Sequence, residues 1–108
     1  MNRKYDVIIV GAGPAGIFAA LELCQSSNLK ILLLEKGKDL DRRRCPAADR
    51  STNCISCSPC NMVSGLGGAG AYSDGKMTLS PDVGGRLKEL IGERETCELI
   101  RYVDSVYL

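Results

Sequence analysis

Three glycines near the N-terminus have the spacing of a binding site for a dinucleotide. Gly11, Gly13 and Gly16 fit the pattern G-x-G-x-x-G in the run GAGPAG. In such a run the first glycine permits a tight turn, the second lets a pyrophosphate approach the backbone, and the third lets a helix pack closely. A helix that starts here would also offer free N–H groups and its positive dipole end to the phosphates. We therefore predict that this glycine turn binds phosphates.

A carboxylate follows the glycine turn at the distance expected for contact with a ribose. Glu35 follows Gly16 at the separation of about 20 residues where a carboxylate can accept hydrogen bonds from the ribose diol. The same charge would repel a 2′-phosphate, which argues against NADP at this site. Pro14, Ala15 and Lys36 complete the predicted cofactor contacts around the turn and the acid.

The surrounding residues predict the strands and the helix that would position these groups. Val7–Val10 is an unbroken apolar run of β-branched residues and Ile31–Leu34 is a second apolar run, so both suit buried strands. The segment between them carries apolar residues at helical spacing, namely Ile17, Ala20, Leu21 and Cys24. Strand, glycine turn, helix, strand and acid in this order predict the α/β class and a partial Rossmann-like FAD/NAD(P)-binding domain. The alternative is a βαβ unit whose glycines only serve close packing.

Four cysteines in the segment that follows could bind a metal. Cys54, Cys57 and Cys60 have the spacing C-x-x-C-x-x-C, and Cys45 precedes them. Four thiolates could hold Zn²⁺, and the repeated spacing also resembles iron–sulfur ligation. The alternative is free thiols on an irregular loop, since residues 36–62 show no apolar periodicity. The sequence leaves these alternatives open.

A run of three arginines, Arg42–Arg44, lies in the same segment directly before Cys45. Because Asp39 and Asp41 stand beside these arginines, we expect the run to be a solvated surface. The alternative is that one of the arginines reaches the phosphates of the cofactor.

A second glycine-rich stretch, VSGLGGAGAYSDGK, occupies residues 63–76. Glycine at this density indicates that a ligand or another part of the backbone approaches closely. A flexible linker is the alternative, but apolar residues such as Leu66 and Tyr72 are unlike a Gly/Ser linker.

The C-terminal third of the chain predicts a short strand and two helices. Lys76–Leu79 suits the strand. A helix is expected after it, from Pro81 or from near Arg86, and Gly92 suits its end. A second helix is expected from Glu93, with one apolar face made of Leu99, Ile100, Val103, Val106 and Tyr107.

The composition excludes several classes of function. Charged residues make up 25% of the chain and the net charge is +1, so no strongly charged partner is implied. One Phe, four Tyr and no Trp leave little aromatic surface for stacking on bases, which argues against nucleic-acid binding. The absence of histidine excludes Ser–His and Cys–His nucleophile pairs and His-ligated metals. Since no apolar run approaches the ~20 residues of a membrane helix, we expect a cytoplasmic protein without membrane contact.

The length of the chain limits how much of a nucleotide-binding fold it can contain. With 108 residues it is at most one domain, whereas a doubly wound nucleotide-binding domain usually has about five or six strands. Only two strands are convincing here. We therefore expect residues 1–108 to be the N-terminal part of an FAD/NAD(P)-binding domain without a substrate domain, completed by the remainder of a parent chain or by another chain.

Two strings of the sequence resemble a known family. The run YDVIIVGAGPAG together with ILLLEKG resembles the N-terminus of FAD-dependent oxidoreductases of the glutathione-reductase-like superfamily. The later string CISCSPCNMVSGLGGAGAYSDGKMTLSP looks like the family usually called uncharacterised FAD-dependent dehydrogenases. The resemblance implies FAD as the cofactor, held through Gly11, Gly13, Gly16 and Glu35. It also implies that the flavin lies near the backbone of Gly67, Gly68 and Ala69.

Three functions are compatible with these observations. The first is the FAD-binding part of a flavin-dependent oxidoreductase that transfers hydride or electrons through FAD, with a small molecule as the substrate. The second is a non-catalytic module or subunit that binds NAD or ADP-ribose. The third is a small metal or redox-sensor protein built on the cysteines. No catalytic acid or base can be named, and Lys76 is the best candidate for a positive charge that stabilises reduced flavin.

Overall fold

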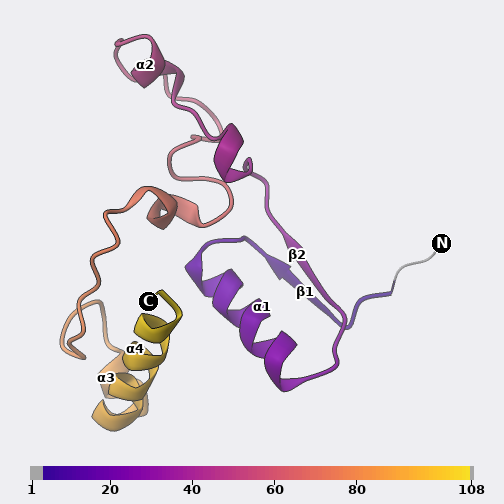
Figure 1. Cartoon of the computed structure of the whole chain (residues 1–108), viewed down its shortest axis with the longest axis vertical. Helices are drawn as coiled ribbons and strands as arrows, with labels where there is room; N and C mark the ends of the chain where they lie inside the picture. The colour runs from indigo at the N-terminus through magenta and orange to yellow at the C-terminus, as the bar shows by residue number, and fades with distance from the viewer. Residues whose placement is uncertain (1–3, 108) are drawn as a thin grey trace. The chain divides into compact units, whose positions relative to one another are not determined.

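The computed structural model describes residues 4–107, and the chain divides into two compact units between Asp74 and Gly75 in the sequence. Figure 1 shows the order of the elements along the chain. The first unit contains β1 (Val7–Val10), α1 (Pro14–Ser26), β2 (Ile31–Leu34), the 3₁₀ turn η1 (Leu40–Arg42), α2 (Pro46–Asp49) and the 3₁₀ turn η2 (Gly68–Tyr72). The second unit contains α3 (Leu87–Ile91) and α4 (Glu93–Tyr107).

The predicted strand–helix–strand unit is confirmed. β1 and β2 are parallel neighbours, with Val7 opposite Ile31 and Val10 opposite Leu34. α1 connects them and packs against both strands. Pro14 occupies the first turn of α1, where a missing N–H costs no helical hydrogen bond and the fixed φ of proline suits the helix. This is a partial Rossmann-like unit of the α/β class, as predicted.

The start of α1 lies very close to the glycine turn that precedes it. A Cβ on Gly16 would overlap the carbonyl oxygen of Gly11 and would lie 3.4 Å from Cγ2 of Ile9. No residue with a side chain fits at this contact without moving the backbone. The close packing predicted for Gly16 is therefore present.

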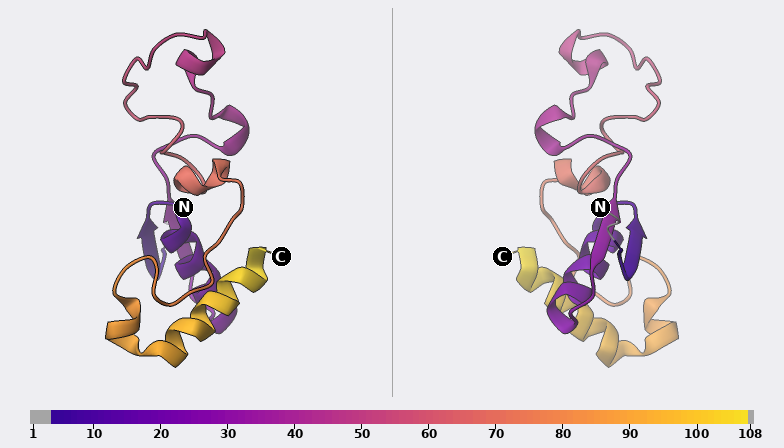
Figure 2. Two further views of the ribbon diagram at one scale, coloured as in Figure 1. Left: turned by 90° about the vertical axis from the view of Figure 1, so that its left-hand side faces the viewer. Right: turned by 90° about the vertical axis from the view of Figure 1, so that its right-hand side faces the viewer.

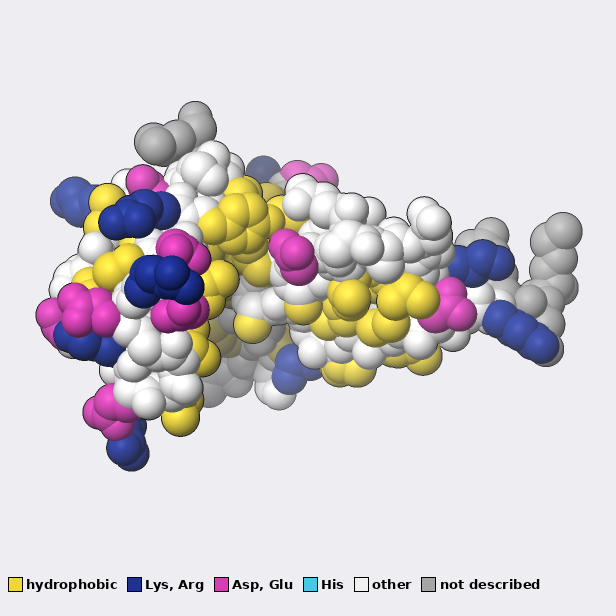
Figure 3. Space-filling view, turned by 90° about the horizontal axis from the view of Figure 1, so that it is seen from below, with side chains coloured by type: hydrophobic (Ala, Val, Ile, Leu, Met, Phe, Trp, Pro, Cys, Tyr) yellow, Lys and Arg dark blue, Asp and Glu magenta, His cyan; other side chains and the backbone are white. Residues whose placement is uncertain are grey.

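The apolar faces of this unit are largely uncovered. Along β1, Ile8 is 58% exposed and Val10 is 83% exposed. Within residues 4–107, Ala12 and Ala47 are the only apolar side chains that are buried. The predicted apolar face of α1 lines an open hollow of about 510 Å³ together with Leu33, Leu40 and Leu66. Apolar side chains accordingly gather on the molecular surface in Figure 3.

The segment between β2 and η2 is an open loop that projects away from the two strands (Figures 1 and 2). It was predicted to lack regular structure, and its only helical parts among the described residues are the short η1 and α2. Its two ends lie side by side, because Lys38 and Gly65 form an isolated parallel bridge. The N–H of Leu66 donates to the carbonyl of Lys38 at 3.2 Å in the same place.

The prediction for the second unit is right for the helices and wrong for the strand. Residues 76–79 have no strand pairing. No helix starts at Pro81, because Gly84 and Gly85 have φ values of 95° and 125°, which lie outside the helical region. α3 begins one residue after Arg86 instead. Gly92 ends α3 with φ 92°, and α4 follows from Glu93 as predicted.

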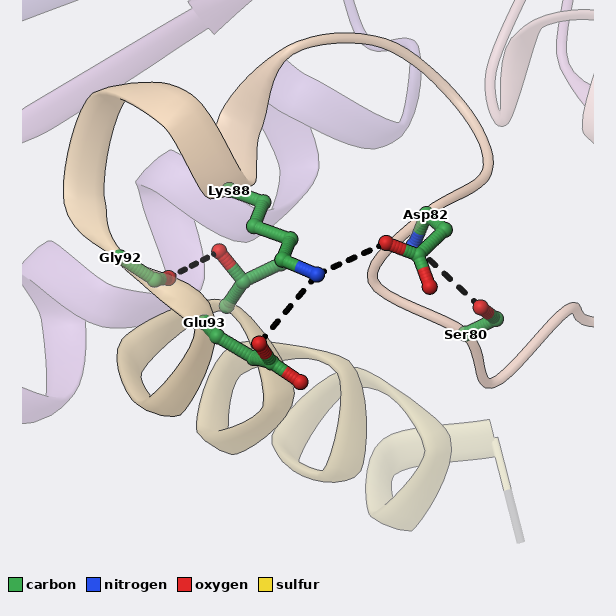
Figure 4. A network of polar contacts seen from close by, with 6 residues as sticks. Ser80, Asp82, Lys88, Gly92 and Glu93 are labelled. Carbon is green, nitrogen blue, oxygen red and sulfur yellow. Dashed lines mark hydrogen bonds and ion pairs between the residues drawn. The ribbon is translucent and has the colours of Figure 1, made fainter.

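A lysine ties the turn before α3 to both helices of the second unit. Lys88 Nζ lies 2.9 Å from Oδ1 of Asp82 and 3.2 Å from Oε2 of Glu93. Figure 4 shows the lysine pointing toward both carboxylates. The hydrogen bond to Asp82, and then the one to Glu93, raises the pKa of Lys88 above its ordinary value. All three side chains are substantially exposed, so solvent screens this network and its contribution to stability is modest.

No helix in the described part of the chain is both long and apolar enough to cross a membrane.

Candidate functional site

The glycine turn between β1 and α1 leaves open space at its centre. Gly11 has φ 101°, a conformation that favours glycine, and its N–H donates to the carbonyl of Leu34 at 2.7 Å. Ala12 is 1% exposed and anchors the turn. Gly13 is extended, with φ −78° and ψ 179°, and a Cβ built on it would meet no atom within 4 Å. The backbone at Gly13 is therefore open to the close approach of a ligand.

The N-terminus of α1 faces the same turn. Gly13 is the N-cap residue and supplies no side chain to cap the helix, and the first turn contains no acidic residue. The first N–H groups of a helix have no intrahelical acceptor, and Pro14 itself has no N–H group. Those of Ala15 and Gly16 belong to this first turn. With the positive end of the helix dipole, they suit an anion bound beside Gly13.

The carboxylate of Glu35 links the glycine turn to the loop after β2. Its Oε2 accepts the N–H of Ala12 at 2.8 Å, and its Oε1 accepts the N–H of Gly37 at 2.8 Å. The N–H of Ala12 and then that of Gly37 lower the pKa of Glu35, with smaller lowering effects from Gly65 and Lys36. An ionised carboxylate offers about four acceptor positions, so it retains capacity for a ribose hydroxyl. The Glu35 carboxylate therefore holds the glycine turn in place and still has acceptor positions for a ribose hydroxyl.

The lowered pKa of Glu35 predicts how stability changes in acid. Its ordinary pKa is 4.5 and the folded value is lower, so its contribution to stability is complete above 4.5 and is lost as the pH falls through the folded pKa. Glu35→Gln has no charge to titrate. Urea unfolding of the protein should therefore show a wild-type advantage in stability over Glu35→Gln that is constant above pH 4.5 and shrinks below it. An advantage that stays unchanged in acid would contradict the hydrogen bonds assigned to the carboxylate.

The second glycine-rich segment lies against the first. The N–H of Gly67 donates to the carbonyl of Ala12 at 2.8 Å. A Cβ on Gly68 would lie 3.5 Å from Cα of Gly13 and 3.5 Å from Cδ of Pro14. Gly67 and Gly68 have φ values of 83° and 60°, and η2 begins at Gly68. The close backbone approach predicted for this segment is thus present, and Gly68 borders the open space over Gly13.

Arg43 is a buried residue near the candidate site that sequence reasoning missed. The prediction of a solvated arginine run holds for Arg42 and Arg44, which are exposed, and is wrong for Arg43, which is 3% exposed. Its Nε donates to the carbonyl of Asn61 at 2.8 Å and its Nη1 to that of Leu66 at 2.7 Å. Its Nη2 donates to two more carbonyls at 2.9 Å, those of Met62 and Gly68. Its acceptors are thus four backbone carbonyls of residues 61–68.

A tyrosine completes the surroundings of this arginine. Cζ of Arg43 lies 4.8 Å from the centroid of the Tyr72 ring, at cation–π distance. The hydroxyl of Tyr72 donates to the carbonyl of Arg43 at 2.8 Å. No signal in the sequence distinguishes Arg43 from the arginines on either side of it, because its acceptors are backbone carbonyls, which every residue has.

The four cysteines are not gathered into a metal site. In residues 4–107 no three His, Cys, Asp or Glu side chains lie close enough to share a metal ion. Cys45 precedes α2, where its carbonyl accepts the N–H of Asp49, whereas the carbonyl of Cys60 accepts the N–H of Ser64. Cys54 and Cys57 lie on the irregular stretch between them. The loop backbone thus follows local turns instead of wrapping around one point, and the predicted Zn²⁺ or iron–sulfur site has no support.

The remaining site predictions fall in both units. Lys36 is exposed beside Glu35, and Ala69 lies in η2. Lys76 lies in the second unit, outside the unit that carries the glycine turn. Its predicted role near a flavin stays a prediction.

Comparison with known proteins agrees with this geometry. Residues 5–55 match the family described as pyridine nucleotide-disulphide oxidoreductase. An uncharacterized protein of Clostridium beijerinckii is 44% identical over 79 residues, which are 69% of this chain and 14% of that protein. A Marinomonas mediterranea protein provisionally named as an FAD-dependent oxidoreductase is 49% identical over 35 residues, 32% of this chain and 10% of that protein. No solved structure matches significantly.

A plant oxidoreductase is another relative that this chain matches over a short stretch. The mitochondrial electron transfer flavoprotein-ubiquinone oxidoreductase of Oryza sativa is 45% identical over 42 residues, 34% of this chain and 7% of that protein. The chain thus spans 14% or less of these three curated relatives. The β1–α1–β2 geometry is that of a partial Rossmann-like unit, and the matched family and two of these relatives are described as oxidoreductases.

Proposed function

We propose that this chain is the FAD-binding part of a flavin-dependent oxidoreductase that transfers hydride or electrons. The observation that carries the proposal is the convergence of two glycine segments on Gly13. The turn at residues 11–16 leaves open space beside Gly13, Gly68 borders that space, and Glu35 is hydrogen-bonded to the same turn. A dinucleotide needs a close approach for its pyrophosphate and a carboxylate for its ribose, and these features match both needs.

The residues have separate roles in this proposal. The N–H groups at the start of α1 bind the pyrophosphate, the backbone at Gly11 and Gly13 gives it room, and Glu35 accepts a ribose hydroxyl. The backbone of residues 67–69 lies beside the flavin. When bound, FAD supplies the redox chemistry, and the protein supplies binding, orientation and electrostatics. We assign no acid or base in this chain to the reaction.

The remainder of the protein completes the site in this proposal. Because the chain spans a small share of its curated relatives, we propose that further residues, from the same chain or a second one, cover the exposed faces of β1 and α1. They would also carry the substrate domain. The fold by itself indicates no substrate.

The absorption spectrum of the purified full-length protein tests this function. We expect the visible bands of an oxidised flavin, which a chemical reductant should bleach and air should restore. Glu35→Ala removes an ionised acceptor and should weaken FAD binding roughly tenfold or more. Tight binding of NAD or ADP-ribose by a preparation that takes up no flavin would contradict the proposal and would favour a non-catalytic nucleotide-binding module.

A further inference from the structure

Arg43 lies in the open loop, and a single residue, Gly68, separates its side chain from the space over Gly13. Its guanidinium donates to the carbonyl of Gly68 at 2.9 Å, and a Cβ on Gly68 would lie 3.5 Å from Cα of Gly13. Any movement of Gly68 therefore changes the size of the space that we assign to the cofactor. Arg43 itself does not line that space, since it is almost completely buried.

The shape of the guanidinium suits this connection. Its nitrogens reach the start of the segment at Asn61 and Met62 and the end of it at Leu66 and Gly68, with all four distances between 2.7 and 2.9 Å. A planar group with five fixed donors can hold four carbonyls at once, which a lysine ammonium with three donors at one point cannot. The segment from 61 to 68 is therefore closed on itself around one side chain.

The backbone is built to admit this side chain. A Cβ on Gly65 would lie 2.7 Å from Cδ and 2.9 Å from Nε of Arg43, and Gly65 has φ 128°. Only glycine allows the arginine stem to pass this close and the chain to turn in this way. The Tyr72 ring lies on the guanidinium, and the Tyr72 hydroxyl is bonded to the Arg43 carbonyl. Glycine, tyrosine and arginine thus form one arrangement whose outer edge is Gly68.

We propose that Arg43 is a positioning residue for the flavin cofactor: it fixes the carbonyls of residues 61–68 so that the backbone at Gly67 and Gly68 forms one wall of the cofactor site. This inference rests on the proposed FAD binding and adds a residue that does not touch the cofactor. Loss of Arg43 removes the one side chain that donates to all four carbonyls, and the wall relaxes around them.

Arg43→Ala in the full-length protein tests the proposal, with Arg44→Ala as the matched control. Both changes remove one positive charge from the same run, but Arg44 is exposed. We expect Arg43→Ala to weaken FAD binding roughly tenfold or more, and to change the visible circular dichroism of the flavin that still binds. Arg44→Ala should match the wild type in both. Millimolar guanidinium chloride should restore Arg43→Ala by occupying the vacated place between the carbonyls, whereas ammonium chloride should not.

The other outcomes separate the alternatives. A wild type that binds no flavin would refute the proposed function, and wild-type affinity and spectrum in Arg43→Ala would refute only the inference. A purely structural role would lower the folded fraction while the folded protein kept its affinity and spectrum, which also overturns the proposal. If Arg43→Ala is recovered only as aggregate, we compare its refolding in guanidinium chloride with its refolding in ammonium chloride. A yield of flavin-binding protein that is no greater with guanidinium overturns the proposal. Arg43→Lys, which keeps the charge without the fork, should bind FAD more weakly than the wild type.

Discussion

Gly13→Val is expected to abolish FAD binding by the full-length protein while its fold survives. Gly13 is extended, with φ −78° and ψ 179°, so valine can adopt the same backbone conformation. A Cβ at Gly13 would meet no protein atom within 4 Å, so the branched side chain would occupy only the space assigned to the pyrophosphate. Valine is a poorer N-cap than glycine, which costs about 1 kcal/mol of helix stability. Isothermal titration of the apoprotein with FAD measures the loss of binding.

Two controls show whether space at Gly13 is the cause. Gly13→Ala should retain weakened binding, because its methyl group fills less of the same space. Gly70→Ala should bind FAD normally, since a Cβ there also meets no atom within 4 Å and Gly70 has no positive φ. The melting temperatures of the two Gly13 variants should fall by no more than the few degrees that about 1 kcal/mol costs, and that of Gly70→Ala should stay close to the wild-type value. Wild-type affinity in Gly13→Val would show that the pyrophosphate lies elsewhere.

The first strand–helix–strand unit could be predicted because its determinants are local. The apolar runs, the glycine turn and Pro14 each specify their own conformation, and they follow one another without interruption. Gly16 is the clearest case, because the predicted close packing appears as an overlap of its Cβ with the Gly11 carbonyl. Where several local signals agree, the conformation of a segment can be predicted without knowing which other segments pack against it.

The environment of Arg43 could not be predicted because it depends on residues that are distant in sequence. Its acceptors begin at Asn61, 18 residues away, and end at Gly68, 25 residues away. Composition favoured a solvated run because acids flank it, and this holds for its two neighbours. The cysteine spacing left the metal site open for a similar reason, since a ligand pattern specifies a metal site only if the loop folds to bring the ligands together.

The strand expected at residues 76–79 failed for a related reason. Apolar content gives a segment strand propensity, but a strand exists only when another strand pairs with it. Within the described residues the single sheet contains β1 and β2. Both strands also present side chains to a face that is not covered, including Ile8, Val10 and Leu34. These exposed faces lead to an expectation for the chain on its own.

The isolated 108-residue chain is expected to be marginally stable and to bind hydrophobic dye. Its accessible surface is 8528 Å², whereas two separately compact units of these lengths would expose about 7,000 Å². The excess includes the side chains of Ile8 and Val10, which are 58% and 83% exposed. Dye fluorescence per chain should therefore be higher than when the residues that we propose to cover these faces are present, and thermal unfolding should be broad. Cooperative melting, monomeric elution and no dye binding would together contradict this expectation.

Val10→Lys is expected to lower dye binding by the isolated chain but to destabilise the full-length protein. Val10→Lys places a charge at a position that is almost fully exposed in the isolated chain, so it should lower dye binding there with little loss of structure. In the full-length protein we expect the remaining residues to cover β1, and a buried, unpaired lysine would then cost several kcal/mol. Urea unfolding of the full-length variant measures that cost. A matched change at Leu90, which is 79% exposed in the second unit, shows whether that unit is covered as well. If Val10→Lys left the full-length protein as stable as the wild type, the exposed face of β1 would be a true surface and the proposed covering by further residues would be wrong.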